Sequence, residues 1–209
     1  MAQIVGFISQ KGGVGKSTLA RGLSREAAAS GLKVKLADLD TQQGTSVDWY
    51  RRRLENGATP IFSVESFKTA SQALRPAEQF DLLLLDGPAR ASSATFEIAQ
   101  AATLVVQPSG ASIDDLRPAV LVFHELVKAG VPKQRLVFAL CRMGTDAEEV
   151  ESRGYIEQAG YVTLDGSLPE RPSYRHASNI GLSITETRYP QLNQRADKLI
   201  QSMVDKLNG

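Results

Sequence analysis

A glycine-rich segment near the start of the sequence constrains the fold more than any other feature. It follows the apolar run IVGFIS and leads directly into a helical pattern. Glycines let backbone N–H groups turn around a phosphate without a Cβ clash, and the first turn of a helix adds partial positive charge. A strand, such a loop and a helix in this order predict a site for a nucleoside triphosphate. The residues expected to bind it are Gly12, Gly13, Val14, Gly15, Lys16, Ser17 and Thr18.

Each polar residue of this loop has an expected role. Lys16 reaches the β- and γ-phosphates, the Ser17 hydroxyl is a Mg²⁺ ligand, and Thr18 contacts the α-phosphate. The usual pattern G-x-x-x-x-G-K-[ST] has a glycine where this sequence has Gln10. A second lysine, Lys11, stands at the beginning of the loop, where Lys16 already supplies a phosphate contact. A solvated loop lysine is the plain alternative for Lys11.

The remainder of the sequence alternates between apolar runs and helical patterns. Several runs are apolar on both faces, which is typical of parallel strands covered on both sides. Gly31, Gly130 and Gly160 are expected to end three helices. The alternation predicts one α/β domain over residues 1–209, with a doubly wound, mostly parallel sheet flanked by helices. The expected strands are Ile4–Ser9, Lys33–Asp38, Leu82–Asp86, Thr103–Pro108 and Leu136–Cys141, with weaker candidates near Ile61 and Tyr161, and the expected helices are Lys16–Ser30, Ser112–Ala129, Asp146–Ala159 and Gln191–Leu207.

Acidic residues follow two of the expected strands at their carboxyl ends, where such sheets bind ligands. The run FDLLLLD ends in Asp86, whose carboxylate is expected to contact Mg²⁺ through water and Ser17. Asp38 and Asp40 follow the second strand, where a carboxylate orients an attacking water or holds a metal-bound water. Capping of a following helix is the alternative for either of these two residues.

The segment KGGVGKST resembles the deviant Walker A loop, KGGxGK[ST], of the ParA/MinD family of P-loop ATPases. The resemblance covers nearly the whole chain and is closest to small ParA-type partition ATPases that lack an N-terminal helix-turn-helix. It implies ATP and Mg²⁺ as cofactors and a homodimer that forms with ATP. In that family the early lysine reaches across the dimer to the partner's phosphates. The resemblance therefore implies that Lys11 acts in trans, as an arginine finger does.

The family's form of the second carboxylate segment is D-x-D-P-Q-G. The match implies that Asp40 is the hydrolytic carboxylate and that Asp38 is a supporting residue on the metal side. The positions that carry the match are Asp38, Asp40, Gln42 and Gly44, with Thr41 in place of the proline and Gln43 inserted.

Two further expectations come from the resemblance. Gly87 and Pro88, directly after Asp86, are expected to form a switch-like turn that senses the γ-phosphate. The adenine is expected to lie against the segments after the sixth and seventh strands, at Cys141, Arg142, Leu168 and Pro169.

Composition removes several classes of protein. The formal net charge of +1 does not by itself indicate a nucleic-acid binder or an enzyme for acidic substrates. The single cysteine, Cys141, excludes a disulfide within the chain and the relatives whose dimer is bridged by an iron–sulfur cluster. Its apolar neighbours indicate a buried strand position. The first residues lack a signal-peptide pattern and no apolar run approaches about 18 residues, so we expect a cytoplasmic protein.

Members of the family differ in what the ATP-bound dimer binds. Partition members bind DNA nonspecifically and are stimulated by a ParB-type or cargo-adaptor protein, whereas MinD-type members place a C-terminal amphipathic helix on the membrane. The terminal apolar stripe here lacks a dense basic face, so we expect it to pack on the core and we expect no membrane partner. The residues expected to contact nonspecific double-stranded DNA are Arg171, Arg175, Arg188, Arg195 and Lys198, with a second basic cluster at Tyr50–Arg53. An ordinary solvated surface is the alternative for both groups.

The leading hypothesis is a nucleoid-associated switch that hydrolyses ATP slowly and with Mg²⁺. Its ATP-bound dimer would bind DNA and be released by partner-stimulated hydrolysis, in plasmid or chromosome segregation or in cargo positioning. One alternative is a MinD-like positioning ATPase on the membrane. A less favoured alternative is a metabolic P-loop ligase or kinase, whose turnover requires a small substrate.

Overall fold

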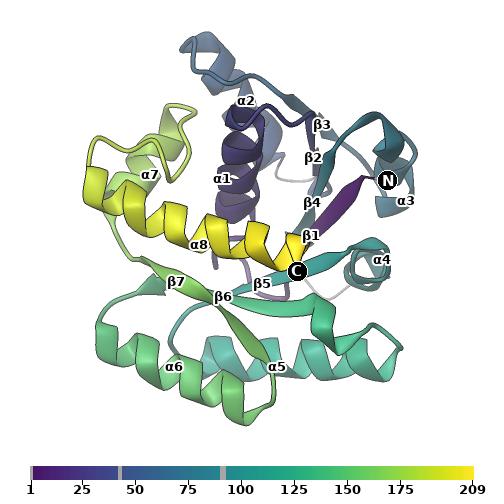
Figure 1. Cartoon of the computed structure of the whole chain (residues 1–209), viewed down its shortest axis with the longest axis vertical. Coiled ribbons are helices and arrows are strands. Elements are labelled where there is room, and N and C mark those ends of the chain that lie inside the picture. Colours follow the sequence, from purple (N-terminus) through teal and green to yellow (C-terminus); the bar gives the residue numbers. More distant parts are fainter. Residues whose placement is uncertain (1, 42–43, 90–92) are drawn as a thin grey trace.

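Seven parallel strands form the centre of the molecule. The computed structural model describes residues 2–41, 44–89 and 93–209. Within these residues the strands lie in the order β3-β2-β4-β1-β5-β6-β7, each parallel to its neighbours (Figure 1). Strand order runs in opposite directions on the two sides of β1, which makes the sheet doubly wound, as the sequence predicts. The strands are β1 (Gln3–Ser9), β2 (Val34–Asp38), β3 (Ser63–Ser66), β4 (Leu82–Ala89), β5 (Leu104–Ser109), β6 (Leu136–Met143) and β7 (Val162–Pro169).

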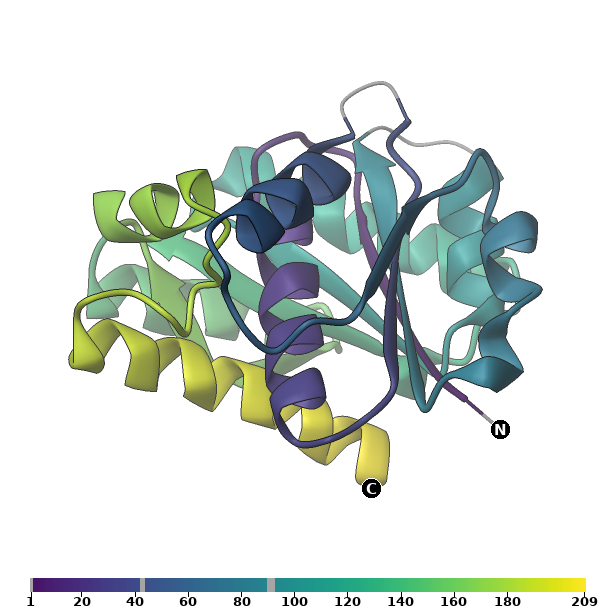
Figure 2. The same ribbon diagram turned by 90° about the horizontal axis from the view of Figure 1, so that it is seen from above.

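Helices cover both faces of this sheet. Buried side chains of α1, α7 and α8 pack on one face, and those of α3, α4, α5 and α6 pack on the other. Figure 2 shows α1 and α8 side by side on the first face, with α2 beside α1. The helices are α1 (Lys16–Ala29), α2 (Thr45–Glu55), α3 (Ala70–Leu74), α4 (Ser93–Ala101), α5 (Ile113–Lys128), α6 (Asp146–Gln158), α7 (Pro172–Asn179) and α8 (Pro190–Asn208), with short 3₁₀ turns η1 (Ala77–Gln79) and η2 (Lys133–Arg135).

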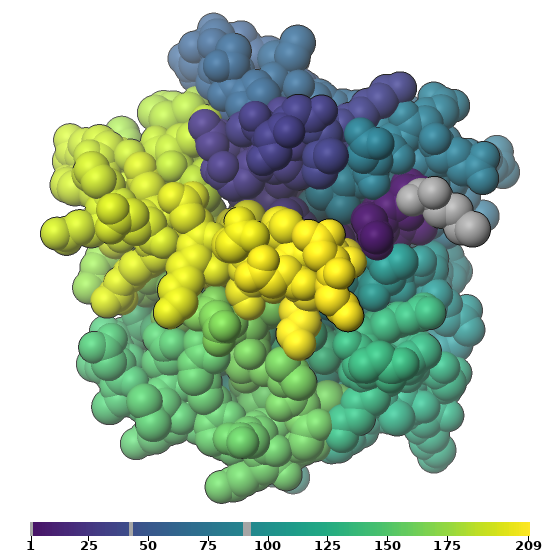
Figure 3. Space-filling view, in the orientation of Figure 1, coloured from purple at the N-terminus to yellow at the C-terminus, as the bar shows by residue number. Residues whose placement is uncertain are grey.

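The C-terminal helix α8 lies flat across the first face of the sheet. Its Ala196, Leu199, Ile200 and Met203 side chains are almost completely buried in the same core as α1. Figure 3 shows α8 in the middle of this face, between α1 and the segments of β7 and α6. The expectation that its apolar stripe packs on the core is therefore confirmed. In the described parts of the chain, no helix combines the length and apolar character required to cross a bilayer.

The predicted ends of three helices are confirmed. Gly31, Gly130 and Gly160 follow α1, α5 and α6, and their φ angles of 87°, 94° and 79° are those of a left-handed helix end. The helix α6 also begins with a capping box between Thr145 and Glu148. The polar helices α2 and α7 and the short helices α3 and α4 are absent from the sequence prediction. The weak candidate strand near Ile61 is shifted, because β3 begins at Ser63.

The prediction of a turn at Gly87 and Pro88 is wrong. Both residues belong to β4, which continues to Ala89 with a shift in its pairing to β1 between Phe7 and Ser9. Gly87 lies so close to β1 that a Cβ would be 2.7 Å from the carbonyl oxygen of Phe7. The backbones of β4 and β1 therefore approach each other closely at Gly87. A residue with a side chain at this position would prevent that close approach.

Sheet register brings the predicted site together. Asp86 of β4 is paired with Phe7 of β1 on one side and with Asp38 of β2 on the other. The three strands are parallel, so the phosphate loop after β1 and both carboxylates lie at the same edge of the sheet.

Candidate nucleotide and metal site

The glycine-rich loop passes directly into α1. The N-cap residue of α1 is Gly15, which has no side chain to bond the first turn of the helix. Gly15 has a φ of 118°, and a Cβ there would lie 3.2 Å from Cys141 Sγ. The first N–H groups of a helix have no partner within the helix. Together with Lys16 they form an arrangement that suits a phosphate group.

Lys16 is buried at the start of α1, with 7% of its surface exposed. Burial lowers its pKa, while the carboxylates of Asp86 and Asp40 act in the opposite direction. A lysine held among carboxylates in a largely dry position is suited to receive a strongly charged anion. This environment supports the expected role of Lys16 in binding the phosphates.

Lys11 lies in a different environment. Its side chain is 55% exposed and forms an ion pair with Asp115 of α5. An ion pair this exposed contributes little to stability, so the ammonium group can exchange Asp115 for a more highly charged partner. The predicted role of Lys11 in a second subunit stays a prediction.

Asp86 is the buried carboxylate of the site, with 2% of its surface exposed. Its Oδ2 accepts a 2.8 Å hydrogen bond from the Ser46 hydroxyl of α2. Its Oδ1 has no hydrogen-bond partner among the described residues. Burial raises the pKa of Asp86, and the guanidinium of Arg21 is the largest opposing influence, followed by the Ser17 and Ser46 hydroxyls.

These residues fit a magnesium ion that is carried in with a nucleotide. A buried carboxylate oxygen that has no hydrogen-bond partner among the described residues, beside the Ser17 hydroxyl, is the kind of hard oxygen ligand that Mg²⁺ prefers. Within residues 2–41, 44–89 and 93–209, no group of three or more His, Cys, Asp or Glu side chains is placed to hold a metal ion. Mg²⁺ is commonly held by one or two protein oxygens, phosphates and water, and Ser17 and Asp86 would supply the protein oxygens.

Asp38 acts as a cap for α2. Its Oδ2 accepts hydrogen bonds from the backbone N–H groups of Ser46 (2.8 Å) and Val47 (3.3 Å), and its Oδ1 accepts one from Asp40 N (3.1 Å). The helix-capping alternative therefore describes Asp38 in this structure. Its predicted role on the metal side stays a prediction, since it lies next to Asp86 in the sheet.

Asp40 lies on the loop between β2 and α2. It is partly buried, and its carboxylate is near enough to Lys16 to affect the pKa of that lysine. Gly44 N donates a 2.7 Å hydrogen bond to its carbonyl oxygen. The adjoining positions Gln42 and Gln43, which enter the family match, lie outside the described residues.

A cavity of about 540 Å³ opens beside the loop. The four residues expected to contact the base, Cys141, Arg142, Leu168 and Pro169, all line it, together with Gly13, Gly15 and Thr18 of the loop. Burial raises the pKa of the Cys141 thiol to about 12, so this cysteine is a neutral apolar wall. The expectation of a buried strand cysteine is confirmed.

Charged residues form the rim of this cavity. Arg142 Nε donates to Glu170 Oε2 at 2.7 Å, and Arg175 Nη1 contacts Glu170 Oε1 at 2.5 Å. Arg142 has a φ of 60°, a left-handed conformation that non-glycine residues seldom adopt. Strained backbone of this kind often occurs where a ligand is bound.

The five residues expected to contact DNA are distributed around three hollows. Arg171 and Arg175 line the cavity just described, and Arg188 lies over the ring of Tyr189 beside a second hollow. Arg195 and Lys198 line a third, which also contains Asp146, Glu149 and Asp165. Acidic side chains are interleaved with the basic ones, so DNA contact by these residues stays a prediction.

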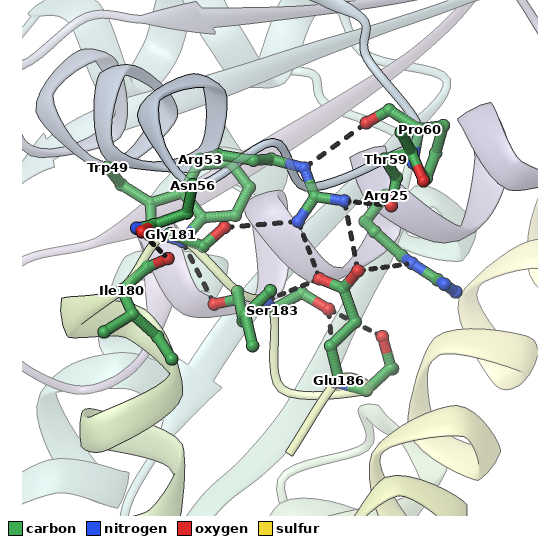
Figure 4. Close-up of polar contacts among 12 residues, drawn as sticks. Arg25, Trp49, Arg53, Asn56, Thr59, Pro60, Ile180, Gly181, Ser183 and Glu186 are labelled. Atoms are coloured by element: carbon green, nitrogen blue, oxygen red, sulfur yellow. Dashed lines mark hydrogen bonds and ion pairs between the residues drawn. The ribbon is translucent and has the colours of Figure 1, made fainter. Parts of the chain in front are cut away.

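The prediction of a second basic surface at Tyr50–Arg53 is wrong for Arg53, whereas Arg51 is exposed. Arg53 is completely buried, and its guanidinium forms a two-pronged ion pair with Glu186, at 2.7 and 3.0 Å (Figure 4). It also donates to the carbonyl oxygens of Thr59, Pro60 and Gly181. Arg53 therefore connects α2 to the segment that follows α7 through hydrogen bonds and an ion pair.

Sequence reasoning missed the residues that connect these parts. Arg21 of α1 contacts both Ser46 of α2 and Ser178 of α7. Tyr174 and Ser178 of α7 line the base cavity. An arginine inside the otherwise apolar stretch LARGL was a usable signal for a buried polar contact. The partners of Arg21 lie far away in the sequence, and no local pattern identifies them.

Comparison with known proteins places the chain in a family. The family model for the CobQ/CobB/MinD/ParA nucleotide binding domain matches residues 5–184. The chromosome-partitioning ATPase Soj of Thermus thermophilus is 33% identical over 220 aligned positions, which cover 87% of each protein. The maintenance of carboxysome distribution protein A of Gloeobacter kilaueensis is 26% identical over 187 residues, which cover 89% of this chain and 85% of that protein.

A solved structure of similar shape is the septum site-determining protein MinD of Pyrococcus horikoshii in its complex with Mg-ADP. It has a TM-score of 0.77 and 20% sequence identity, over 100% of this chain and 98% of that one. At this identity the likeness is one of fold. With the family match over most of the chain and the relationship to Soj, it leads to one conclusion. The chain belongs to the ParA/MinD family of deviant Walker P-loop ATPases.

Proposed function

We propose that this chain is an ATP-driven positioning switch whose ATP-bound homodimer binds DNA without sequence preference. The observation that carries the proposal is the contrast between two lysines of one loop: Lys16 is buried at the start of α1, and Lys11 is exposed beside it. One lysine is in place for the chain's own phosphates. The other faces outward, where a second subunit would present its phosphates.

Within each subunit the proposed division of labour follows the geometry. The backbone from Gly12 to Thr18 and the Lys16 ammonium bind the phosphates, and the cavity of Arg142 and Pro169 receives the base. Mg²⁺, held by Ser17 and near Asp86, would neutralise charge on the β- and γ-phosphates. Asp40 orients the attacking water. Lys11 of the other subunit adds positive charge at the phosphates, so hydrolysis requires the dimer.

The relatives guide the choice of role. One is a chromosome-partitioning ATPase and another maintains carboxysome distribution, so both concern the placing of large cargo in the cell. We infer the same kind of task here, with a partner protein that stimulates hydrolysis and thereby releases DNA. The alternative of a membrane-bound switch has less support, because the apolar stripe of α8 is buried in the core.

The test is sedimentation of the Asp40→Ala protein with long nonspecific duplex DNA, with ATP or ADP, across a salt series. The variant should bind ATP without hydrolysing it. We expect it to pellet with DNA when ATP is present, to remain in solution with ADP, and to lose affinity steeply as salt rises, because counterions are released from the phosphates.

The controls separate the competing functions. Lys16→Ala should not pellet under any condition, because it lacks the nucleotide. Anionic lipid vesicles replace DNA in a parallel series and should not carry the protein down. Absence of DNA binding at low salt by an intact ATP-bound dimer would contradict the proposal, and ATP-dependent vesicle binding would favour the membrane alternative.

A further inference from the structure

Arg21 is a buried cation beside the proposed nucleotide site, and neither the phosphate loop nor the family match accounts for it. It lies on α1, four residues after Ser17, with 8% of its surface exposed. Burial lowers its pKa to about 10, with Asp86 and Asp38 opposing that shift, so the guanidinium is charged at neutral pH. A buried charge is costly unless several partners stabilise it, which indicates a specific task.

The contacts of Arg21 join three helices. Its Nε donates to Ser46 Oγ of α2 at 3.1 Å, and its Nη1 donates to Ser178 Oγ of α7 at 3.2 Å. The guanidinium also lies over the indole ring of Trp49 of α2, 5.5 Å from the ring centroid. Ser178 lines the base cavity. One side chain therefore bridges the base cavity and the N-terminal turn of α2.

The direction of the hydrogen bonds through Ser46 is fixed by chemistry. An arginine only donates, so Ser46 Oγ must accept from Arg21. The single hydroxyl proton of Ser46 then goes to its other neighbour, Asp86 Oδ2, at 2.8 Å. With Asp86 ionised, as a metal ligand is, the chain Arg21–Ser46–Asp86 has one direction, and it occupies one of the two carboxylate oxygens of Asp86.

The other oxygen of Asp86 is the one that matters for the metal. Oδ1 is buried and has no hydrogen-bond partner among the described residues. We propose that Arg21 is a positioning residue for the magnesium side of this site: it holds the Ser46 hydroxyl on Asp86 Oδ2 and thereby keeps Oδ1 available to the metal. The inference rests on the proposed function, because it takes a magnesium-bound nucleotide to be the ligand.

The same contacts give α2 a fixed place relative to the metal. Ser46 N donates to Asp38, and Thr45 Oγ1 approaches Ser17 Oγ at 3.5 Å. Without Arg21, the Ser46 hydroxyl loses the donor that orients it, its proton is free to turn toward another acceptor, and Asp86 loses the hydrogen bond that fixes its orientation. The effect falls on metal-dependent binding and leaves the contacts of Lys16 and the loop backbone in place.

The experiment measures the affinity for a non-hydrolysable ATP analogue by calorimetry, with Mg²⁺ and with EDTA, in the full chain. The ratio of the two affinities reports the contribution of the metal. We expect Arg21→Met to reduce this ratio by about tenfold, the size of one hydrogen bond to a charged group, and to change the affinity in EDTA by less than about threefold.

Two further variants make the result specific. Ser46→Ala breaks the same chain at its next link and should reduce the ratio similarly, and the double variant should be no worse than the more affected single one, because the residues act through one path. Arg25→Met is the matched control, one turn further along α1 and paired with Glu26 and Glu186, and it should leave the ratio unchanged. If Arg21→Met does not fold, Arg21→Lys replaces it, because it keeps the buried charge but loses the planar fork.

The outcomes separate this inference from the proposed function. A wild-type chain that binds no nucleotide removes the proposed function and the inference with it. An unchanged magnesium ratio in Arg21→Met, with wild-type binding intact, overturns the inference alone. Additive losses in the Arg21→Met/Ser46→Ala double variant also overturn it, because the two residues would then act separately.

Discussion

At the scale of single residues, two lysines of one loop have unlike surroundings. Lys16 is nearly inaccessible to solvent and lies among carboxylates. Lys11 is more than half exposed and is paired with one aspartate. In the sequence both lysines lie beside glycines; the loop pattern assigns Lys16 to the phosphates, and only the family resemblance assigns a task to Lys11. The structure adds that Lys16 is buried and Lys11 is exposed, so replacing each lysine should affect nucleotide binding differently.

The two lysines should therefore behave differently when each is replaced. Lys16→Ala should weaken nucleotide binding by roughly a hundredfold, because charge-assisted contacts to the phosphates are lost. Lys11→Ala should bind ADP as a monomer with nearly the wild-type affinity, because the Lys11 ammonium group is exposed and paired with Asp115. Calorimetric titration with Mg-ADP measures both. Equal losses in the two variants would contradict separate roles.

At the scale of helices and strands, local signals predict some elements and not others. Strands that are apolar on both faces are evident in the sequence. Helices that end at a glycine are evident too, and α1, which is followed by Gly31, is an example. The helix α2 is polar along most of its length and depends on distant partners: Trp49 donates to the carbonyl oxygen of Leu182, and Arg53 pairs with Glu186. Neither contact has a local pattern.

The same limit applies to the site. The phosphate loop and Asp86 are recognisable from spacing, because glycines and a run of leucines ending in aspartate have local causes. The wall that α7 contributes to the base cavity is not, since the helix is short and polar. Charge predicts that Arg53 lies on the surface, but Arg53 is completely buried. Its carboxylate partner lies 133 residues further along the chain.

The Arg53–Glu186 pair should give folding stability a distinct pH dependence. Burial alone would raise the pKa of Glu186, but hydrogen bonds from Arg53 and Ser183 hold it below its ordinary value of 4.5. A carboxylate with a lower pKa when folded stabilises fully above its unfolded pKa, and this contribution disappears as the pH falls through the folded value. Wild-type stability should therefore decrease as the pH is lowered from about 5 to 3.

Urea unfolding at a series of pH values measures this dependence. Glu186→Gln should be less stable at neutral pH, because Arg53 keeps its buried charge without a carboxylate partner, and its stability should depend less on pH over the acidic range. Asp48→Asn, which removes the exposed partner of Arg51 on the same helix, should follow the wild-type curve. Parallel curves for the wild type and Glu186→Gln would contradict this account of α2.

At the scale of the whole molecule, the phosphate loop, the carboxylates and the cavity beside the loop all lie at the carboxyl edge of the sheet. The helix α8 covers the face of the sheet on which α1 also packs. In the proposed function, positive charge from a neighbouring subunit completes the nucleotide site of each chain. A twofold-symmetric dimer would supply it, because each subunit would place its own Lys11 at the other's phosphates. The central claim is this exchange of lysines between subunits.

Mixing two inactive variants tests that exchange most directly. If each subunit places its Lys11 in the other's site, a mixed dimer of Lys11→Ala and Asp40→Ala has one complete site. That site contains the intact Asp40 of one subunit and the intact Lys11 of the other. ATP hydrolysis measured on DNA should be absent from each variant alone and should recover on mixing to roughly a quarter of the wild-type rate, since half the dimers are mixed and half their sites are complete. If Lys11 served its own subunit, both sites would stay incomplete, and no recovery at any mixing ratio would contradict the account.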